Sequence, residues 1–432
     1  MIRRSIFAAA LIAAALAGCA RTAQTGPPQS AAVDPPAAPA PPPLPAPPPP
    51  PPPPPPTADE PGPRAPASTG TVPLPRGAPR PAIIVGAAPP PASGLPPPAA
   101  SANYAVVRVF FGTNRKPTNV AGLEGRFANA PGPLSYGAVD VSVPRSHRRG
   151  VIERPGTVSG WLFSPDPRKH FTIRAFTALD RRALLREVAA KTAGSGGPGR
   201  RLAMIFVHGF NVGFDDAAFR TAQMSYDIGF RGAPLFYSWP SQHSLIGYNT
   251  DSARIETSRP LIKRFISDVI VGSRADRVII IAHSMGTRGT TRALAELARE
   301  RPEQTRKIAA LILAAPDIQA ETFRRDIAPH LSRMAATTTL YASSEDLALQ
   351  TSHHLAGRPA LGDARGGVRV FQNMVSIDAT KAGTSFLGHS AYGDSPALLR
   401  DIAEIVAGRT AAAQRPWLRR RPGGHYVLEL VR

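Results

Sequence analysis

A serine at the junction of an apolar run and a helix-compatible stretch is the first residue that could do covalent chemistry. Ser284 lies in the segment IIAHSMG (280–286), directly after the apolar run 278–282. A serine becomes nucleophilic when a base takes its proton and donors receive the oxyanion, and a sharp strand-to-helix turn with small neighbours presents it for that reaction. Ala282 stands at the first small position of the usual Gly-x-Ser-x-Gly pattern, and Gly286 at the second. We predict that Ser284 is the nucleophile, with a helix N-cap as its alternative role.

The loop HGFN (208–211) could supply the donors. It follows the apolar run 202–207 and precedes Ser284 in the chain, the order in which such a loop gives one backbone N–H to the oxyanion. Gly209 allows the backbone to approach closely, and we expect His208 to pack the loop in place rather than to act as the base. The predicted oxyanion hole consists of the N–H of Met285 and that of Phe210 or Asn211.

The base should come late if the chain order is nucleophile, acid, then histidine. His389 lies in GHS (388–390), after the last predicted strand and before a predicted helix, and is the favoured proton carrier. The other candidate histidines are His243, His330, His353 and His354. The adjacent pair among these could suggest a metal, but no matching carboxylate or cysteine set accompanies it. No metal and no other cofactor is predicted.

Two aspartates compete to be the acid that orients the base. Asp346 follows the apolar run 337–342, at the expected carboxyl end of a strand, and is favoured as the partner of His389. Asp317 closes the preceding strand in the segment APD (315–317) and stays open as the alternative, with Glu345 a lesser one.

The elements that must position these residues alternate along the chain from Tyr104 onward. Short apolar runs separated by amphipathic stretches indicate an α/β fold, with a mainly parallel central sheet and helices on both faces. The predicted strands are 105–111, 137–143, 171–176, 202–207, 234–238, 277–282, 309–314, 337–342 and 374–377, the first three antiparallel. The predicted helices are 214–229, 252–271, 286–301 and 397–407, and Asn249 or Asp251 could cap the second. This domain is expected to span 102–412, followed by a basic tail at 413–432.

The N-terminus has the layout of an export signal. Two arginines precede an apolar run, and the segment LAGC (16–19) resembles the bacterial lipobox. That resemblance implies cleavage after residue 18 and a lipid anchor on Cys19, whereas an ordinary secretory signal with an incidental cysteine is the alternative. We expect a lipoprotein of the bacterial cell envelope, in the outer membrane facing the periplasm.

Residues 19–101 are dominated by proline and alanine, which predicts a disordered, extended linker. It could hold the domain off the membrane, or be a tolerated low-complexity insert. The formal net charge of +21 comes from arginines spread along the chain, so no nucleic-acid partner is predicted.

The motifs together resemble a known family. They are FGTNR (111–115), VHGFN (207–211), YSWP (237–240), AHSMG (282–286), APD (315–317) and GHS (388–390), in this order. The sequence is similar, over about 106–405, to bacterial α/β-hydrolases of unknown function described as esterase/lipase-superfamily proteins. The resemblance implies an α/β-hydrolase fold with a Ser-His-Asp triad and leaves the substrate open.

From these observations we expect a serine hydrolase that cleaves carboxylic esters of small molecules or lipids through an acyl-enzyme. A non-catalytic envelope binding or scaffold lipoprotein on a hydrolase fold is the alternative. Three aromatic residues could line the pocket or belong to the core, namely Trp239, Tyr248 and Phe386. The oligomeric state stays open.

Overall fold

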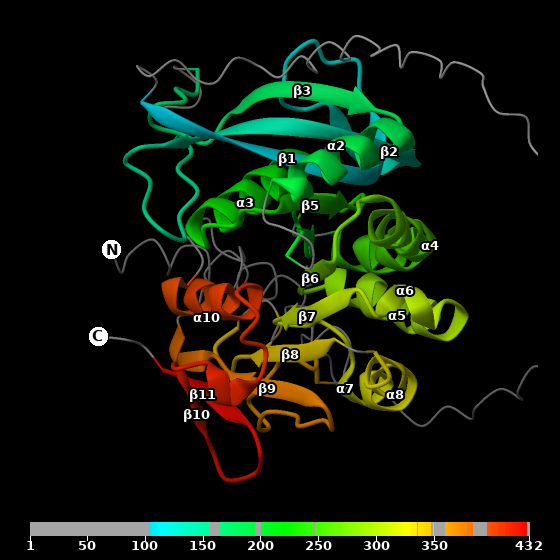
Figure 1. The fold of residues 1–432 in the computed structure, drawn as a ribbon, viewed down its shortest axis with the longest axis vertical. Helices are drawn as coiled ribbons and strands as arrows, with labels where there is room; N and C mark the ends of the chain where they lie inside the picture. Colours follow the sequence, from blue (N-terminus) through cyan, green and yellow to red (C-terminus); the bar gives the residue numbers. More distant parts are fainter. Residues whose placement is uncertain are drawn as a thin grey trace, which may run out of the picture. The chain divides into compact units, whose positions relative to one another are not determined.

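The computed structural model describes most of the domain and none of the residues before 103. The described residues are 103–155, 164–194, 200–244, 247–334, 336–346, 349, 359–382 and 395–429. The expected signal, the lipid anchor at Cys19 and the linker lie outside them. In the described part, one sheet has the strand order β10-β11-β9-β8-β7-β6-β4-β5-β1-β2-β3, with helices on both faces (Figure 1).

Three antiparallel strands open the sheet, as expected. They are β1 (Tyr104–Pro117), β2 (Phe127–Pro144) and β3 (Ile173–Leu179). β1 then pairs in parallel with β5, the outermost of six parallel strands. These six are β4 (Leu202–Val207), β5 (Ala233–Ser238), β6 (Arg277–His283), β7 (Ile308–Ala314), β8 (Thr337–Ala342) and β9 (Met374–Asp378). Every predicted strand is present. β1 and β2 extend well beyond the predicted ranges 105–111 and 137–143, and the other strands shift by a few residues at the ends.

Five longer helices cover the sheet, and four of them were predicted. They are α2 (Arg181–Ala193), α3 (Phe214–Asp227), α4 (Tyr248–Gly272), α5 (Gly286–Glu300) and α10 (Pro396–Val406). Short turns of helix are α6 (Pro302–Thr305), α7 (Ala320–Thr322), η3 (Phe323–Ile327), α8 (Ala328–Leu331), η4 (Thr380–Ala382) and η5 (Ala412–Gln414). None of the described helices is both long and apolar enough to span a bilayer.

The start of α4 differs from the prediction. The helix begins at Tyr248 with Gly247 as its N-cap, so neither Asn249 nor Asp251 caps it. The Asp251 carboxylate instead accepts hydrogen bonds from the Ser241 hydroxyl at 2.6 Å and from a backbone N–H of the same loop. A capping residue and a loop anchor look alike in sequence, because both are short polar side chains next to a helix.

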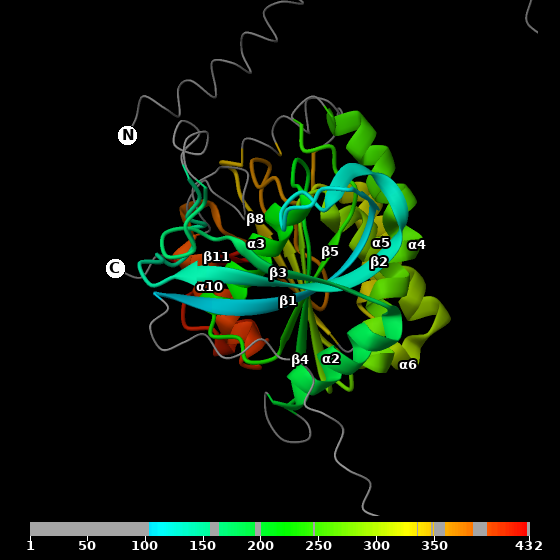
Figure 2. The same cartoon turned by 90° about the horizontal axis from the view of Figure 1, so that it is seen from above.

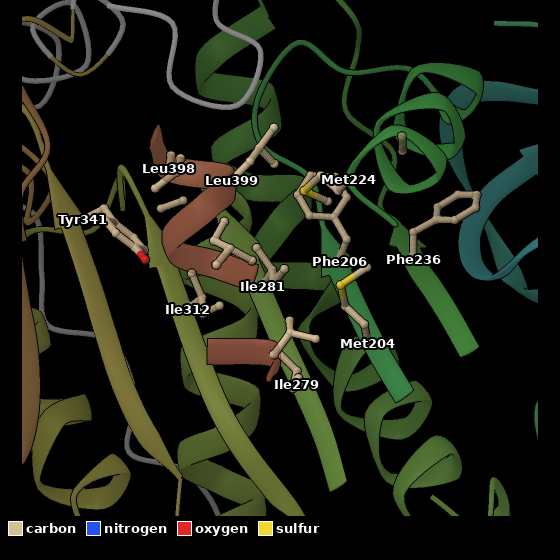
Figure 3. Packing of buried hydrophobic residues seen from close by; sticks show 14 of the residues in the cluster. Met204, Phe206, Met224, Phe236, Ile279, Ile281, Ile312, Tyr341, Leu398 and Leu399 are labelled. Carbon is tan, nitrogen blue, oxygen red and sulfur yellow. The ribbon is translucent and has the colours of Figure 1, made fainter. Parts of the chain in front are cut away.

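Two apolar layers hold the sheet between the helices. Met204 and Ile279 point to the face covered by α3 and α10, where Leu398 packs (Figure 3). Ile205 and Ile280 point to the opposite face, which α2, α4 and α5 cover (Figure 2). Alternate residues of β4 and β6 are therefore buried on opposite sides, as continuous apolar strands of a parallel sheet require.

The described part of the expected C-terminal tail, 413–429, belongs to the sheet. β10 (Leu418–Arg420) and β11 (Tyr426–Leu428) form a hairpin, and β11 pairs in parallel with β9. Each strand has only three residues, so neither carries the alternation that would reveal it in the sequence. The domain accordingly continues past 412.

Candidate active site

Ser284 occupies a strained turn between β6 and α5. Its φ is 48°, a left-handed conformation that costs a residue with a Cβ about 1–2 kcal/mol. Hydrogen bonds hold the turn: the Ser284 N–H donates to the Ala314 carbonyl at 3.0 Å, and the Ser284 carbonyl accepts from the Thr287 hydroxyl at 2.5 Å. The side chain is 3% exposed. This geometry is that of a nucleophile elbow, which presents the serine above the sheet.

Two glycines allow the elbow to touch the loop that follows β4. A Cβ on Gly286 would lie 2.2 Å from the carbonyl oxygen of His208. A Cβ on Gly209 would lie 2.8 Å from the Cβ of Ser284 and 2.9 Å from Nδ1 of His283. All three distances are too short for real contacts, so only glycine fits at these two positions. The predicted close approach of the two backbones is present, because β4 and β6 are neighbours in the sheet.

His208 stabilises the loop that follows β4. Its ring stacks on Trp239 with centroids 5.2 Å apart, and its nitrogens lie 2.8 Å from the Gly209 carbonyl and 3.1 Å from the Ser238 hydroxyl. Burial lowers the pKa of His208 to about 3, so the ring is neutral at pH 7. A carbonyl only accepts, so Nδ1 carries the proton and Nε2 accepts from Ser238. This arrangement fits the packing role expected of His208.

Trp239 is core rather than pocket. Its side chain is fully buried, and its indole N–H donates to the His208 carbonyl at 2.8 Å. Tyr248, by contrast, is partly exposed and lies edge-to-face against Phe210, with ring centroids 5.5 Å apart. Phe386 lies outside the described residues. Of the three aromatic residues considered for the pocket, Tyr248 is thus the one that the structure describes as partly exposed, next to the predicted oxyanion loop.

Arg115, near the end of β1 and in the motif FGTNR (111–115), is a supporting residue for which the sequence predicted no role of its own. Its guanidinium is fully buried and donates to the Ser238 hydroxyl at 2.8 Å. Its other acceptors are the carbonyls of Val212 and Ser241 and the side chain of Asn129. The Arg115 guanidinium therefore connects the loops after β4 and β5, and it shares the Ser238 hydroxyl with His208. The available signal was an arginine inside an apolar strand, since such a side chain is rarely buried without partners.

The two competing aspartates follow neighbouring strands, β7 and β8, and both are buried. Asp317 accepts from the Tyr248 hydroxyl at 2.9 Å and pairs with the Arg288 guanidinium at 3.0 Å. Burial lowers the pKa of Arg288, but the charges and hydrogen bonds of Asp317 and Tyr248 together outweigh this effect and leave that pKa raised. The Oδ1 of Asp346 accepts from the Leu349 N–H at 3.0 Å.

The structure brings together part of the predicted site. Ser284 and Met285 follow β6, Phe210 and Asn211 follow β4, and the acid candidates follow β7 and β8. These strands are parallel neighbours, so all of these residues lie at one edge of the sheet. His389, and the histidine pair once considered for a metal, lie outside the described residues. Within the described part, no group of three potential metal ligands occurs.

Residues 198–409 match the model of a protein family described as alpha/beta hydrolase of unknown function (DUF900). This segment of the chain is similar to that family. The matched segment contains the elbow, the loop after β4, both acid candidates and His389, and it confirms the predicted α/β-hydrolase fold. A search of curated proteins finds no match to the chain. The family supports a hydrolase and leaves its substrate open.

One added methyl group tests the contact between the turn at Ser284 and the loop after β4. Gly209→Ala should lower kcat for ester hydrolysis by about 10²–10³, because the new Cβ pushes the donor loop away from Ser284. Gly366→Ala is the matched control, since its Cβ meets only the Arg369 side chain at 3.9 Å. Rates and thermal unfolding are measured for both variants. Equal activity in the two would contradict the backbone contact.

Proposed function

We propose that this domain is a serine hydrolase that cleaves carboxylic esters. The observation that carries the proposal is the left-handed turn at Ser284, in backbone contact with a glycine loop. Strain of this kind persists only where the surrounding structure enforces it, and it clusters at functional sites. A helix N-cap does not need a positive φ, so the alternative role of Ser284 leaves the strain without a cause.

The proposed reaction has two steps. Ser284 Oγ attacks the acyl carbon while His389 takes its proton, and the tetrahedral oxyanion accepts from the N–H of Met285 and of Phe210 or Asn211. His389 then gives the proton to the departing alkoxide, which leaves as the alcohol. Water attacks the acyl-enzyme with His389 again as the base, and release of the acid restores the serine. The proposal uses no metal or cofactor.

Asp346 is the proposed acid. The Asp317 carboxylate already holds the Arg288 guanidinium and the Tyr248 hydroxyl, both directed at Oδ2. A carboxylate bound to a fixed cation stabilises an imidazolium less, because its charge is compensated. Asp346 is equally buried and follows the carboxyl end of β8, the position expected of the acid that orients His389.

The domain is proposed to work from the cell envelope. The segment LAGC (16–19) supports a lipid anchor on Cys19, and the proline-rich stretch supports a spacer between anchor and domain. A hydrolase held at a bilayer could reach esters of lipids or of acylated envelope material, and these are the proposed substrates.

Covalent labelling tests the nucleophile. A fluorophosphonate should label the wild type once per chain, at Ser284, and Ser284→Ala should not be labelled. Hydrolysis of p-nitrophenyl esters across acyl lengths should fall in that variant by about 10⁶ in kcat, as when a triad member is removed. Thr287→Ala, which removes a hydroxyl from the same turn, is the control for local disturbance. An unlabelled but folded wild type would favour the non-catalytic scaffold instead.

A further inference from the structure

A polar cavity lies beside the carboxyl ends of β8 and β9 and the turn that leads into β11. Its volume is about 470 Å³. Three basic side chains line it, Lys381, Arg421 and His425, together with the hydroxyls of Ser344 and Thr380 and the carboxylate of Asp378. The proposed reaction assigns no role to any of these groups.

Backbone hydrogen bonds fix the wall formed by β8 and β9. The Ser344 N–H donates to the Thr380 hydroxyl at 3.0 Å, and the Thr380 N–H donates to the Asp378 carboxylate at 2.9 Å. The one acidic side chain of the cavity is therefore already engaged by a backbone donor. A rigid wall with placed hydroxyl groups suits a small polar ligand group.

The opposite wall is the turn between β10 and β11. The Arg421 N–H donates to the His425 carbonyl at 2.9 Å, which holds these two residues side by side. Neither Arg421 nor Lys381 forms an ion pair with another residue in the ranges that the structure describes. The exposed side chains of Lys381 and Arg421 bring two positive charges to a cavity with one carboxylate, so the cavity favours an anion.

The cavity and the nucleophile belong to one surface. β6, β7, β8 and β9 are parallel, so the cavity wall formed by Ser344 and Thr380 lies at the sheet edge where Ser284 follows β6. Neighbouring strands lie about 4.8 Å apart, which puts β8 and β9 roughly 10–15 Å across the sheet from β6. A single extended substrate could span that distance. Ligands of open α/β sheets bind at the carboxyl ends of the strands.

We propose that this cavity binds the anionic end, carboxylate or phosphate, of the ester substrate. The substrate class is then an ester whose acyl chain carries an acidic group remote from the scissile carbonyl. This inference rests on the proposed ester hydrolysis. The two acid groups share the same recognition by Arg421 and Lys381, which donate to oxygens of either one.

Binding of inorganic phosphate tests the cavity without any reaction. Calorimetry on the full chain should detect a phosphate site whose Kd rises at least about tenfold in Lys381→Ala/Arg421→Ala, since two charged donors are removed. Lys191→Ala/Arg231→Ala is the control with the same change in charge, because both side chains are exposed and neither lines the cavity. Wild type that does not bind phosphate, or equal losses in both double variants, would overturn the anion site.

Matched substrates test whether the site serves catalysis. For p-nitrophenyl esters with a terminal carboxylate, KM should rise about tenfold in Lys381→Ala/Arg421→Ala while kcat is retained. The corresponding esters with a neutral methyl ester terminus should show no change in KM. The carboxylate advantage in the wild type should peak at one chain length, because the span to Ser284 is fixed.

The outcomes separate the two proposals. If phosphate binds but the carboxylate and neutral esters react alike in every variant, the cavity holds a free anion or a lipid headgroup, and the substrate assignment is overturned. If phosphate binding is lost in the double variant but wild type hydrolyses no ester, the proposed function fails together with that assignment. A selective rise in KM for carboxylate esters alone supports both.

Discussion

Asp346→Asn is expected to lower kcat for ester hydrolysis by about 10⁴ while the protein stays folded. The amide cannot stabilise the imidazolium of the base, and it favours the wrong tautomer. Its carbonyl oxygen still accepts from the Leu349 N–H, so the local turn should survive. Steady-state kinetics on one p-nitrophenyl ester and circular dichroism measure the two effects.

Two controls make this result decisive. Glu345→Gln makes the same kind of change at an exposed neighbour and should leave kcat unaltered. Asp317→Asn removes the partner of Arg288 and should cost stability more than kcat. A 10⁴-fold loss in Asp317→Asn with little loss in Asp346→Asn, on the scale expected for the acid, would reverse the assignment.

Arg415→Met is expected to destabilise the domain by about 3–5 kcal/mol, because it leaves a buried carboxylate without its cation. The guanidinium of Arg415 donates to Asp401 at 2.8 Å, and both side chains are fully buried. The Tyr341 hydroxyl donates to the same carboxylate at 2.5 Å. Urea unfolding followed by circular dichroism gives the change in free energy.

Paired variants separate the lost charge from the lost packing. Arg415→Met combined with Asp401→Asn should recover much of the stability, since no buried charge remains and the amide oxygen still accepts from Tyr341. Arg419→Met removes an exposed ion pair with Glu429 and should have little effect. A single Arg415→Met variant as stable as Arg419→Met would contradict the buried pair.

The sequence predicts most of the central sheet, because apolar runs such as 202–207 and 277–282 have no other simple interpretation. α2 was not predicted: its apolar positions are few, and its fold depends on packing and on the Asp180 N-cap, whose carboxylate accepts from Ala183 N–H at 2.6 Å. β10 and β11 were not predicted. Strands of three residues carry too little pattern in the sequence, and these two are defined by their pairing with each other and with β9.

Local pattern and spatial proximity contribute differently to the candidate site. The turn at Ser284 could be predicted because the strand, the serine and Gly286 are adjacent in sequence. The acid could not, since Asp317 and Asp346 both follow strands, and the contacts of Asp317 with the distant residues Arg288 and Tyr248 leave no mark in the local sequence. The links from Arg115 to the loops after β4 and β5 are also long-range, and no local pattern encodes them.

The strand order has a consequence for how the domain assembles. β4 to β9 join through successive crossovers, with only β4 and β5 exchanged, so the centre of the sheet forms from segments close in sequence. Strands toward the edges pair with strands that are distant in sequence, as β1 does with β5. Contacts between distant segments form more slowly. The turn at Ser284 should therefore form early in folding, whereas Arg115, which holds the loops after β4 and β5, lies on β1, toward the edge of the sheet, and should dock late.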